Sequence, residues 1–414
     1  MIRKNFLVKM LVIFIIICVL IANFSIVSSY NLINDKKIVE RDINNFLFST
    51  KVKTYMRLLK TPSITAAVIK NDSIVWTNAY GFSNFYIRQK ANINSIYVVG
   101  SISKTITAAA IMKIIENKSY NITLDDNVNY WLPFNLENPN YPDINITFRM
   151  LLAHQSSLTD SITDIFYYLP LIEDKVQWLK DRITPDGKYY DGSCWKNYPP
   201  GKEHNYSNIG FILLSYLVEN ITKMNFNDFC KINIFKPLNM KNTSFHNEGL
   251  NKKQFARPYF PISNFIHIPI HHYDTECVCG CAGLRTTCID LAKFLILHMN
   301  KGVYNGVRIL NETTIEEMHR VQYPCEPEKK WFFGGNISAG LGWSHICRNG
   351  IHWQGYNGGA VGFSCNMLIN SDENTGIIML CNKHTYRSVG PYSQIRFDWY
   401  QNLAKLLLTK SNDI

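Results

Sequence analysis

Two stretches of the chain have the apolar pattern of paired strands. Near the beginning, residues 63–69 are mostly apolar, residues 70–72 (Lys-Asn-Asp) have turn composition, and residues 73–80 alternate between apolar and polar side chains. This pattern predicts a hairpin over residues 63–81. Near the end, two apolar runs flank a turn of polar residues and Gly376, which predicts a second hairpin from Phe363 to Cys381.

Other stretches have the apolar spacing of helices. It predicts helices at 101–116, 148–154, 211–219 and 395–408. Thr287 followed by Asp290 is a capping-box pattern, so another helix is expected to begin there. Strands at both ends, with mostly helical sequence between them, predict an α/β (α+β) fold. In it an antiparallel sheet of distant segments is flanked by helices and carries an inserted, mainly helical subdomain at about residues 117–242.

Composition and charge fit a globular protein. The 414 residues are 46% hydrophobic and 18% charged, which is enough apolar material for a large core. The formal net charge is +11. Its Lys and Arg residues are scattered, however, and form no basic stripe interleaved with aromatic residues, so no nucleic-acid partner is expected.

The N-terminus has the three-part layout of a secretory signal peptide. Basic residues precede an apolar run from Met10 to Ala22, and the small residues Val27-Ser28-Ser29 follow. We therefore predict a signal peptide over residues 1–29, a catalytic domain over 30–414, and a secreted or lumenal protein. The alternative is an uncleaved single-pass anchor, the one case in which we expect a membrane partner.

Ten cysteines remain after residue 29, and an even number in a secreted chain suggests disulfides. The cluster over residues 277–288 could instead bind zinc, but its C-x-C-x-C spacing is not the usual paired C-x-x-C. The nearby His267, His271 and His272 have no H-E-x-x-H spacing, so we predict no metal site and keep a zinc hydrolase as a remote alternative. Asn-x-Ser/Thr sequons are frequent and compatible with a glycoprotein.

The segment from Val98 to Glu116 carries the first candidate chemistry. Ser101 stands where an extended segment turns into a helix, and Lys104 follows three residues later, on the same helical face. The unpaired N–H groups of a first helical turn favour developing negative charge. Together these features predict an activated serine nucleophile. A second S-x-x-K over residues 193–196 has no helical pattern and is expected to be coincidental.

Two further motifs follow in order. Pro200-Gly201 predicts a turn into a loop that presents Tyr206 and Asn208, although Tyr206 could simply pack on the next helix with Asn208 as its N-cap. The third motif, residues 355–363 (GYNGGAVGF), places glycines at a strand edge, where a ligand can approach the backbone closely. Its alternative interpretation is a glycine-rich loop that enters the final hairpin.

In the order S-x-x-K, Y-x-N and glycine-containing strand, the chain resembles the serine β-lactamase-related hydrolases of the class C and penicillin-binding-protein-like type. The resemblance covers about residues 40–408 and implies a β-lactamase/transpeptidase-like fold. Supporting segments are Leu124-Asp125-Asp126, Trp131-Leu132-Pro133, residues 151–158 (LLAHQSSL), Gly283-Leu284, Asp290-Leu291-Ala292 and residues 340–343 (GLGW).

This resemblance implies roles for individual residues. Ser101 would be the acylated nucleophile, and Lys104 and Tyr206 would share the general-base work and then protonate the leaving group. Asn208 would bind substrate or the lysine. The backbone N–H groups of Ser101 and Gly359 would form the oxyanion hole.

The third motif departs from the family at one position. The family commonly has Lys or His there, whose charge helps to hold a substrate carboxylate, but this chain has Tyr356. Tyr356, Asn357 and Gly358 are expected to bind substrate. We predict a cofactor-independent serine hydrolase that forms an acyl-enzyme with a small ester, amide or peptide. The alternatives are a catalytically silent binding or scaffold protein, and D-alanyl carboxypeptidase or β-lactamase activity.

Overall fold

The chain divides into two compact units, residues 1–54 and residues 55–412. The computed structural model describes residues 45–160, 174–261, 267–270, 279–324, 336–348, 351–383 and 406–407. In the first unit, residues 45–54 are helical. All elements discussed below belong to the second unit. The predicted signal peptide and nearly all of the predicted helix at 395–408 lie outside the described residues.

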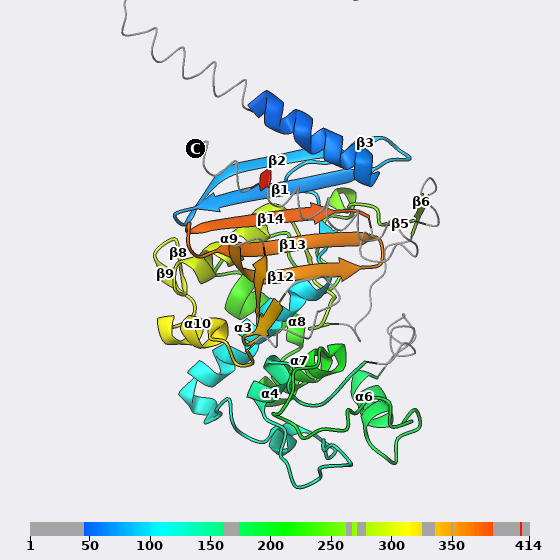
Figure 1. Ribbon diagram of the computed structural model, residues 1–414, viewed down its shortest axis with the longest axis vertical. Coiled ribbons are helices and arrows are strands. Elements are labelled where there is room, and N and C mark those ends of the chain that lie inside the picture. Colours follow the sequence, from blue (N-terminus) through cyan, green and yellow to red (C-terminus); the bar gives the residue numbers. More distant parts are fainter. Residues whose placement is uncertain are drawn as a thin grey trace, which may run out of the picture. The chain divides into compact units, whose positions relative to one another are not determined.

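The second unit contains an eight-stranded antiparallel sheet in the order β10-β11-β12-β13-β14-β1-β2-β3 (Figure 1). Both predicted hairpins form, and they lie side by side because β1 pairs with β14, with Ile64 opposite Cys381. This confirms a sheet built from distant segments. The strands are β1 (Ser63–Lys70), β2 (Ser73–Asn84), β3 (Gln89–Lys90), β10 (Asn336–Ala339), β11 (Ser344–Arg348), β12 (Ile351–Ala360), β13 (Phe363–Asn370) and β14 (Thr375–Cys381).

The middle strands are covered on both faces. Every residue of β13 and β14 is buried, and so are all but the last of β1. Such strands have continuous apolar runs rather than alternation. Helix α9 (Cys288–Met299) packs on β1, β13 and β14. Its N-cap Thr287 accepts a hydrogen bond from the Asp290 N–H, which confirms the start predicted by the capping box.

Helix α3 (Ser103–Glu116) is buried on nearly every side and packs against α7 (Asn208–Thr222). Its buried residues include the polar side chain of Lys104 as well as apolar ones, so the helix lies in the protein interior. In turn, α7 packs against α4 (Phe148–Leu152). The predicted helices at 101–116, 148–154 and 211–219 therefore exist, the second shorter and the third longer than expected. The first begins as a 3₁₀ turn, η1 (Gly100–Ile102).

The remaining elements are short. Every element that the structure describes between residues 117 and 242 is helical, and irregular connections such as residues 132–147 and 184–207 contain several Asn and Pro residues. Besides α4 and α7, these helices are η2 (Lys118–Tyr120), η3 (Val128–Trp131), α6 (Lys175–Ile183), α8 (Phe226–Cys230) and η4 (Lys231–Phe235). Elsewhere lie β4 (Tyr97–Val98), η5 (Lys252–Gln254), β5 (Tyr259–Pro261), β6 (His267–Pro269), β7 (Arg285–Thr286), β8 (Val303–Tyr304), β9 (Val307–Arg308) and α10 (Glu312–His319).

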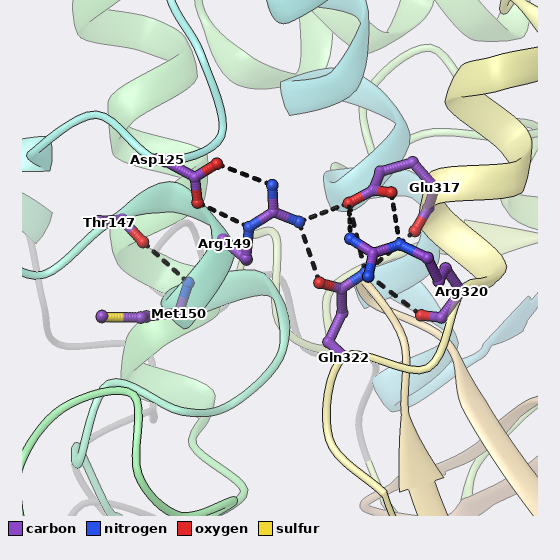
Figure 2. A network of polar contacts seen from close by, with 7 residues as sticks. All are labelled: Asp125, Thr147, Arg149, Met150, Glu317, Arg320 and Gln322. Atoms are coloured by element: carbon purple, nitrogen blue, oxygen red, sulfur yellow. Dashed lines mark hydrogen bonds and ion pairs between the residues drawn. The ribbon is translucent and has the colours of Figure 1, made fainter.

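Arg149 of α4 connects two parts of this unit (Figure 2). Its guanidinium makes a bidentate pair with Asp125, at 2.6 and 2.8 Å, and also reaches Glu317 of α10 and Gln322. Charge-assisted forks of this kind impose orientation as well as attraction. Thr147 caps the same short helix by accepting from the Met150 N–H. Helix α4 is thus held at its start and along its side.

The prediction of disulfides is wrong for the cysteines that the structure describes. No disulfide joins the eight cysteines within the described ranges, and seven of the eight are buried. They pack as small apolar side chains with a weak thiol donor: the thiols of Cys194 and Cys365, for example, lie 3.3 and 3.7 Å from the carbonyl oxygens of Arg182 and Val98. Cys277, Cys325, His271 and His272 lie outside the described residues. Among the described helices, none combines the length and apolarity needed to span a membrane.

Candidate active site

The backbone around Ser101 is shaped by glycine. Gly100 has φ +56°, and a Cβ there would lie 2.4 Å from the Gly359 carbonyl oxygen of β12. A positive φ and a close backbone approach both favour glycine. The turn η1 therefore lies directly against β12 and continues into α3, which places Lys104 one turn after Ser101.

The structure brings the three predicted catalytic side chains together. The Ser101 Oγ and the Tyr206 hydroxyl are 2.6 Å apart, and the Lys104 Nζ is 3.3 Å from the same Oγ. The Lys104 Nζ also lies 4.8 Å from the centre of the Tyr206 ring. Residues more than a hundred positions apart in sequence thus converge on a single hydroxyl.

Lys104 is fully buried, with 0% of its surface exposed. Its Nζ donates to Asn208 Oδ1 and to the Cys281 carbonyl oxygen, each at 2.7 Å. Burial lowers the pKa of Lys104, and the nearby Asp160 carboxylate opposes part of that shift. Burial also raises the pKa of Tyr206 well above its usual value, so this phenol keeps its proton at neutral pH.

Asp160 was not identified from the sequence. Its carboxylate is buried and accepts hydrogen bonds from the Asn208 N–H at 2.9 Å, the Ile209 N–H at 3.1 Å and the Asn208 Nδ2 at 2.8 Å. It thus occupies the N-terminus of α7, where the unpaired N–H groups attract an anion, and it orients Asn208 toward Lys104. The N-cap itself is Ser207, so the alternative that made Asn208 the cap is wrong.

Residues 355–360 of the third motif lie in the regular strand β12, and only Val361 and Gly362 form the turn into β13, so the motif is not a glycine-rich loop. A Cβ on Gly358 would lie 1.8 Å from the Val99 carbonyl oxygen, so this strand contacts the backbone just before Ser101. Gly359 lies beside Gly100, as the 2.4 Å approach shows. The two backbone segments that would supply the oxyanion hole are therefore adjacent.

Tyr356 and Asn357 point to opposite faces of β12, as successive residues of a strand do. Tyr356 is buried. Its hydroxyl oxygen lies 3.1 Å from His154 Nε2, and its side chain shares a hydrogen bond with Tyr206. Asn357 is half-buried, and its side-chain oxygen accepts from Asn366 on β13. The structure thus joins Tyr356 to the catalytic group and leaves Asn357 outside its hydrogen bonds.

This arrangement of a buried lysine, a serine at a helix start and a glycine strand defines a class of protein. Residues 48–392 match the Beta-lactamase family model, and the chain belongs to that family of serine hydrolases. The resemblance and the fold class inferred from the sequence are therefore confirmed.

Two curated relatives illustrate the range of the family. Protein flp of Staphylococcus aureus (strain MW2) is 25% identical over 331 residues, which is 78% of this chain and 59% of that protein. The chain thus spans well under two thirds of that relative's length. N-acetylmuramyl-L-alanine amidase of Bacillus subtilis (strain 168) is 25% identical over 372 residues, 78% of each chain.

Solved structures share the fold. A D-amino acid amidase from Ochrobactrum anthropi SV3, complexed with L-phenylalanine amide, superposes with a TM-score of 0.70 at 18% identity over 89% of this chain and 99% of its own. An octameric penicillin-binding protein homologue from Pyrococcus abyssi has a TM-score of 0.67 at 22% identity, covering 87% and 76%. At these identities the likeness establishes the fold alone.

Proposed function

We propose that this protein hydrolyses a small ester, amide or peptide through a covalent acyl-enzyme on Ser101. One observation carries the proposal: the Ser101 Oγ lies 2.6 Å from the Tyr206 hydroxyl and 3.3 Å from the amine of the buried Lys104. A serine hydroxyl is a weak nucleophile unless a base accepts its proton. Both neighbours are within reach of that proton.

Lys104 is the base in this proposal. A neutral amine has two N–H groups and one lone pair. Each N–H group of Lys104 has an acceptor: Asn208 Oδ1 for one and the Cys281 carbonyl oxygen for the other. With both N–H groups engaged, the lone pair faces the Ser101 Oγ. Burial lowers the pKa of Lys104, which favours the neutral form that can accept the serine proton.

Tyr206 is the acid. As Ser101 attacks, its proton passes to Lys104 and its oxygen bonds to the substrate carbonyl carbon. When the tetrahedral intermediate collapses, Tyr206 donates its proton to the departing oxygen or nitrogen, and the Lys104 ammonium restores it. A phenol whose pKa is raised by burial retains its proton until this step. Water then repeats the sequence on the acyl-enzyme and releases the acid.

The backbone N–H groups of Ser101 and Gly359 would stabilise the oxyanion. Support comes from the tight contact between β12 and the segment before Ser101, in which Gly358 and Gly100 leave no room for a Cβ. Such contacts fix donors in place before the reaction, and preorganised donors are worth about 100- to 1000-fold in rate each.

Tyr356 guides the choice of substrate. Burial raises the pKa of this phenol well above its usual value, so it is neutral at the position where the family commonly has Lys or His. A neutral group there offers no charge for a substrate carboxylate. The proposed substrates are therefore esters and amides without a carboxylate at that position, rather than β-lactams or D-alanyl peptides.

The test is active-site labelling with a fluorophosphonate, followed by mass spectrometry of the tryptic peptides. We expect one adduct on Ser101, no adduct on Ser101→Ala, and loss of nitrophenyl ester turnover in that variant with an unchanged unfolding midpoint. Ser193→Ala, in the second S-x-x-K, is the matched control and should label as wild type does. An adduct elsewhere, or turnover by Ser101→Ala, contradicts the proposal.

A further inference from the structure

His154 is a buried histidine to which the sequence assigned no function. It follows the short helix α4 and its C-cap Ala153, with φ +58° and only 5% of its surface exposed. Helices commonly end with glycine in this left-handed conformation, because a side chain is unfavourable there. A large ring kept in a strained backbone position at a functional site suggests that the ring is needed.

The hydrogen bonds of His154 define where its proton lies. The Ser207 backbone N–H donates to His154 Nδ1 at 3.2 Å, so Nδ1 is unprotonated. Burial lowers the pKa of His154 well below 6.5, so the ring is neutral. A neutral imidazole carries one proton, which must then be on Nε2. That nitrogen lies 3.1 Å from the Tyr356 hydroxyl and donates to it.

We propose that His154 is a positioning residue that sets the direction of a hydrogen-bond chain running from His154 through Tyr356 and Tyr206 to Ser101. This rests on the function proposed above and deepens it. The Tyr356 oxygen accepts from His154, so its own proton is directed to the Tyr206 oxygen, with which it shares a hydrogen bond. In this arrangement Tyr206 donates to the Ser101 Oγ, 2.6 Å away, rather than to the more distant Asn208 Oδ1 at 3.4 Å.

The direction of this chain has a chemical consequence. Because Tyr206 donates to the Ser101 Oγ, the Ser101 proton is left to point at Lys104, 3.3 Å away. The chain thus separates the two roles before substrate arrives, with Lys104 as the base and Tyr206 as the acid. With a proton on Nδ1 instead, the ring could not accept from Ser207, and Tyr356 would lose its donor.

Packing of aromatic rings holds this hydrogen-bond chain in place. The His154 ring lies 4.7 Å from the Tyr206 ring at an interplanar angle of 35°, and 5.0 Å from the Phe211 ring. The helix before His154 is anchored by the Arg149 network (Figure 2). Tyr356 therefore serves as a neutral relay between the rings of His154 and Tyr206. This gives a physical reason for tyrosine at this position, because a lysine ammonium there would have no lone pair to accept the hydrogen bond from His154.

Two substitutions of His154 separate its contacts. Asn tolerates a left-handed backbone and can accept from Ser207, but it is too short to reach Tyr356. Gln has the reach to do both. With p-nitrophenyl acetate, we expect kcat/KM to fall roughly 3- to 10-fold in His154→Asn, the effect of one lost neutral hydrogen bond, mainly through kcat. His154→Gln should recover most of this loss.

A double-mutant cycle tests whether His154 acts through Tyr356. If it does, His154→Asn adds little to the loss already caused by Tyr356→Phe. Losses that multiply, or a His154→Asn enzyme with wild-type kcat, overturn the proposal. Equal loss in the Asn and Gln variants, both with wild-type unfolding midpoints, would also overturn it, because the donor to Tyr356 would then not matter.

The tautomer can be measured without any activity. Ring ¹⁵N chemical shifts of the full chain should show His154 neutral, with the proton on Nε2, throughout about pH 5 to 8. A proton on Nδ1, or a ring that titrates near 6.5, overturns the inference even if Ser101 is the nucleophile. A correct tautomer in a protein that no fluorophosphonate labels would instead refute the proposed function and leave the hydrogen-bond arrangement standing.

Discussion

Replacing Gly358 with alanine should move β12 away from the nucleophile. A Cβ at this position would lie 1.8 Å from the Val99 carbonyl oxygen and 3.1 Å from Ile102. The first contact is with backbone, which cannot rotate away as a flexible side chain does. Because carbon–oxygen approaches under 3.0 Å are essentially never tolerated, the two backbone segments must separate by about 1 Å.

The expected losses follow from that displacement. Overpacking of this kind costs about 1–3 kcal/mol of unfolding free energy. The larger effect should be on catalysis, because Gly359, the next residue, is proposed to supply an oxyanion N–H, and a misplacement of about 1 Å can cost 100-fold in rate. We therefore expect kcat/KM for a nitrophenyl ester to fall about 100-fold, mainly through kcat, while Ser101 can still be labelled slowly.

Gly210→Ala is the matched control. A Cβ there would meet its nearest neighbour, a Leu151 methyl, at an ordinary 3.6 Å, and the residue lies in helix α7. Replacing a helical glycine with alanine stabilises by up to about 1 kcal/mol, so activity should be unchanged. Kinetics and urea unfolding of both variants give the answer. A Gly358→Ala enzyme with kcat/KM within threefold of wild type would refute the reasoning about the strand and the oxyanion hole.

Three further predictions concern the buried lysine, two buried histidines and the arginine network. Lys104→Met should lower kcat/KM about 100- to 10,000-fold and abolish the rise of activity with pH that we expect of the wild type as this lysine, whose pKa burial lowers, loses its proton; a rise of activity with pH that persists in the variant contradicts this. Burial lowers the pKa of His298 and lowers that of His319 to about 3, so the unfolded chain binds more protons below about pH 6.5. Stability is thus present above that pH and lost as it falls, and His298→Leu should flatten the decline of the urea midpoint from about pH 7 to 5. Arg149→Met should cost about 1–2 kcal/mol in thermal unfolding, whereas Arg320→Ala, which removes a more exposed pair with Glu317, should cost under about 1 kcal/mol; equal losses would show that the additional contacts of Arg149 with Asp125 and Gln322 add nothing.

Local sequence patterns predicted the elements that carry the site. The hairpins, the capping box at Thr287 and the one-turn spacing of Ser101 and Lys104 each depend on residues a few positions apart, where periodicity and capping chemistry act directly. The order of the three motifs along the chain was enough to place Tyr206 and Tyr356 in the same predicted site as Ser101 and Lys104. The 2.6 Å contact between Ser101 and Tyr206 is a tertiary result that agrees with this expectation.

The residues that the sequence missed act over long separations. Asp160 binds the start of α7 from 48 positions away, and His154 meets Tyr356 across 202 positions. No local pattern marks a carboxylate or an imidazole for such a role. The prediction of disulfides was wrong for the described cysteines for a related reason. An even count suggested pairing, but a count does not show which thiols lie close in space, and in the described part of the chain the cysteines are free and mostly buried in the core.

The central claim is that Ser101 becomes acylated during turnover. Stopped-flow mixing with a p-nitrophenyl ester, quenched in acid within the first turnover and analysed by mass spectrometry, tests it most directly. The account predicts a burst of nitrophenol equal to the enzyme concentration, together with an acyl group on the peptide that contains Ser101. Turnover with no burst and no acylated Ser101, under conditions in which deacylation is slowed by low temperature, would contradict it.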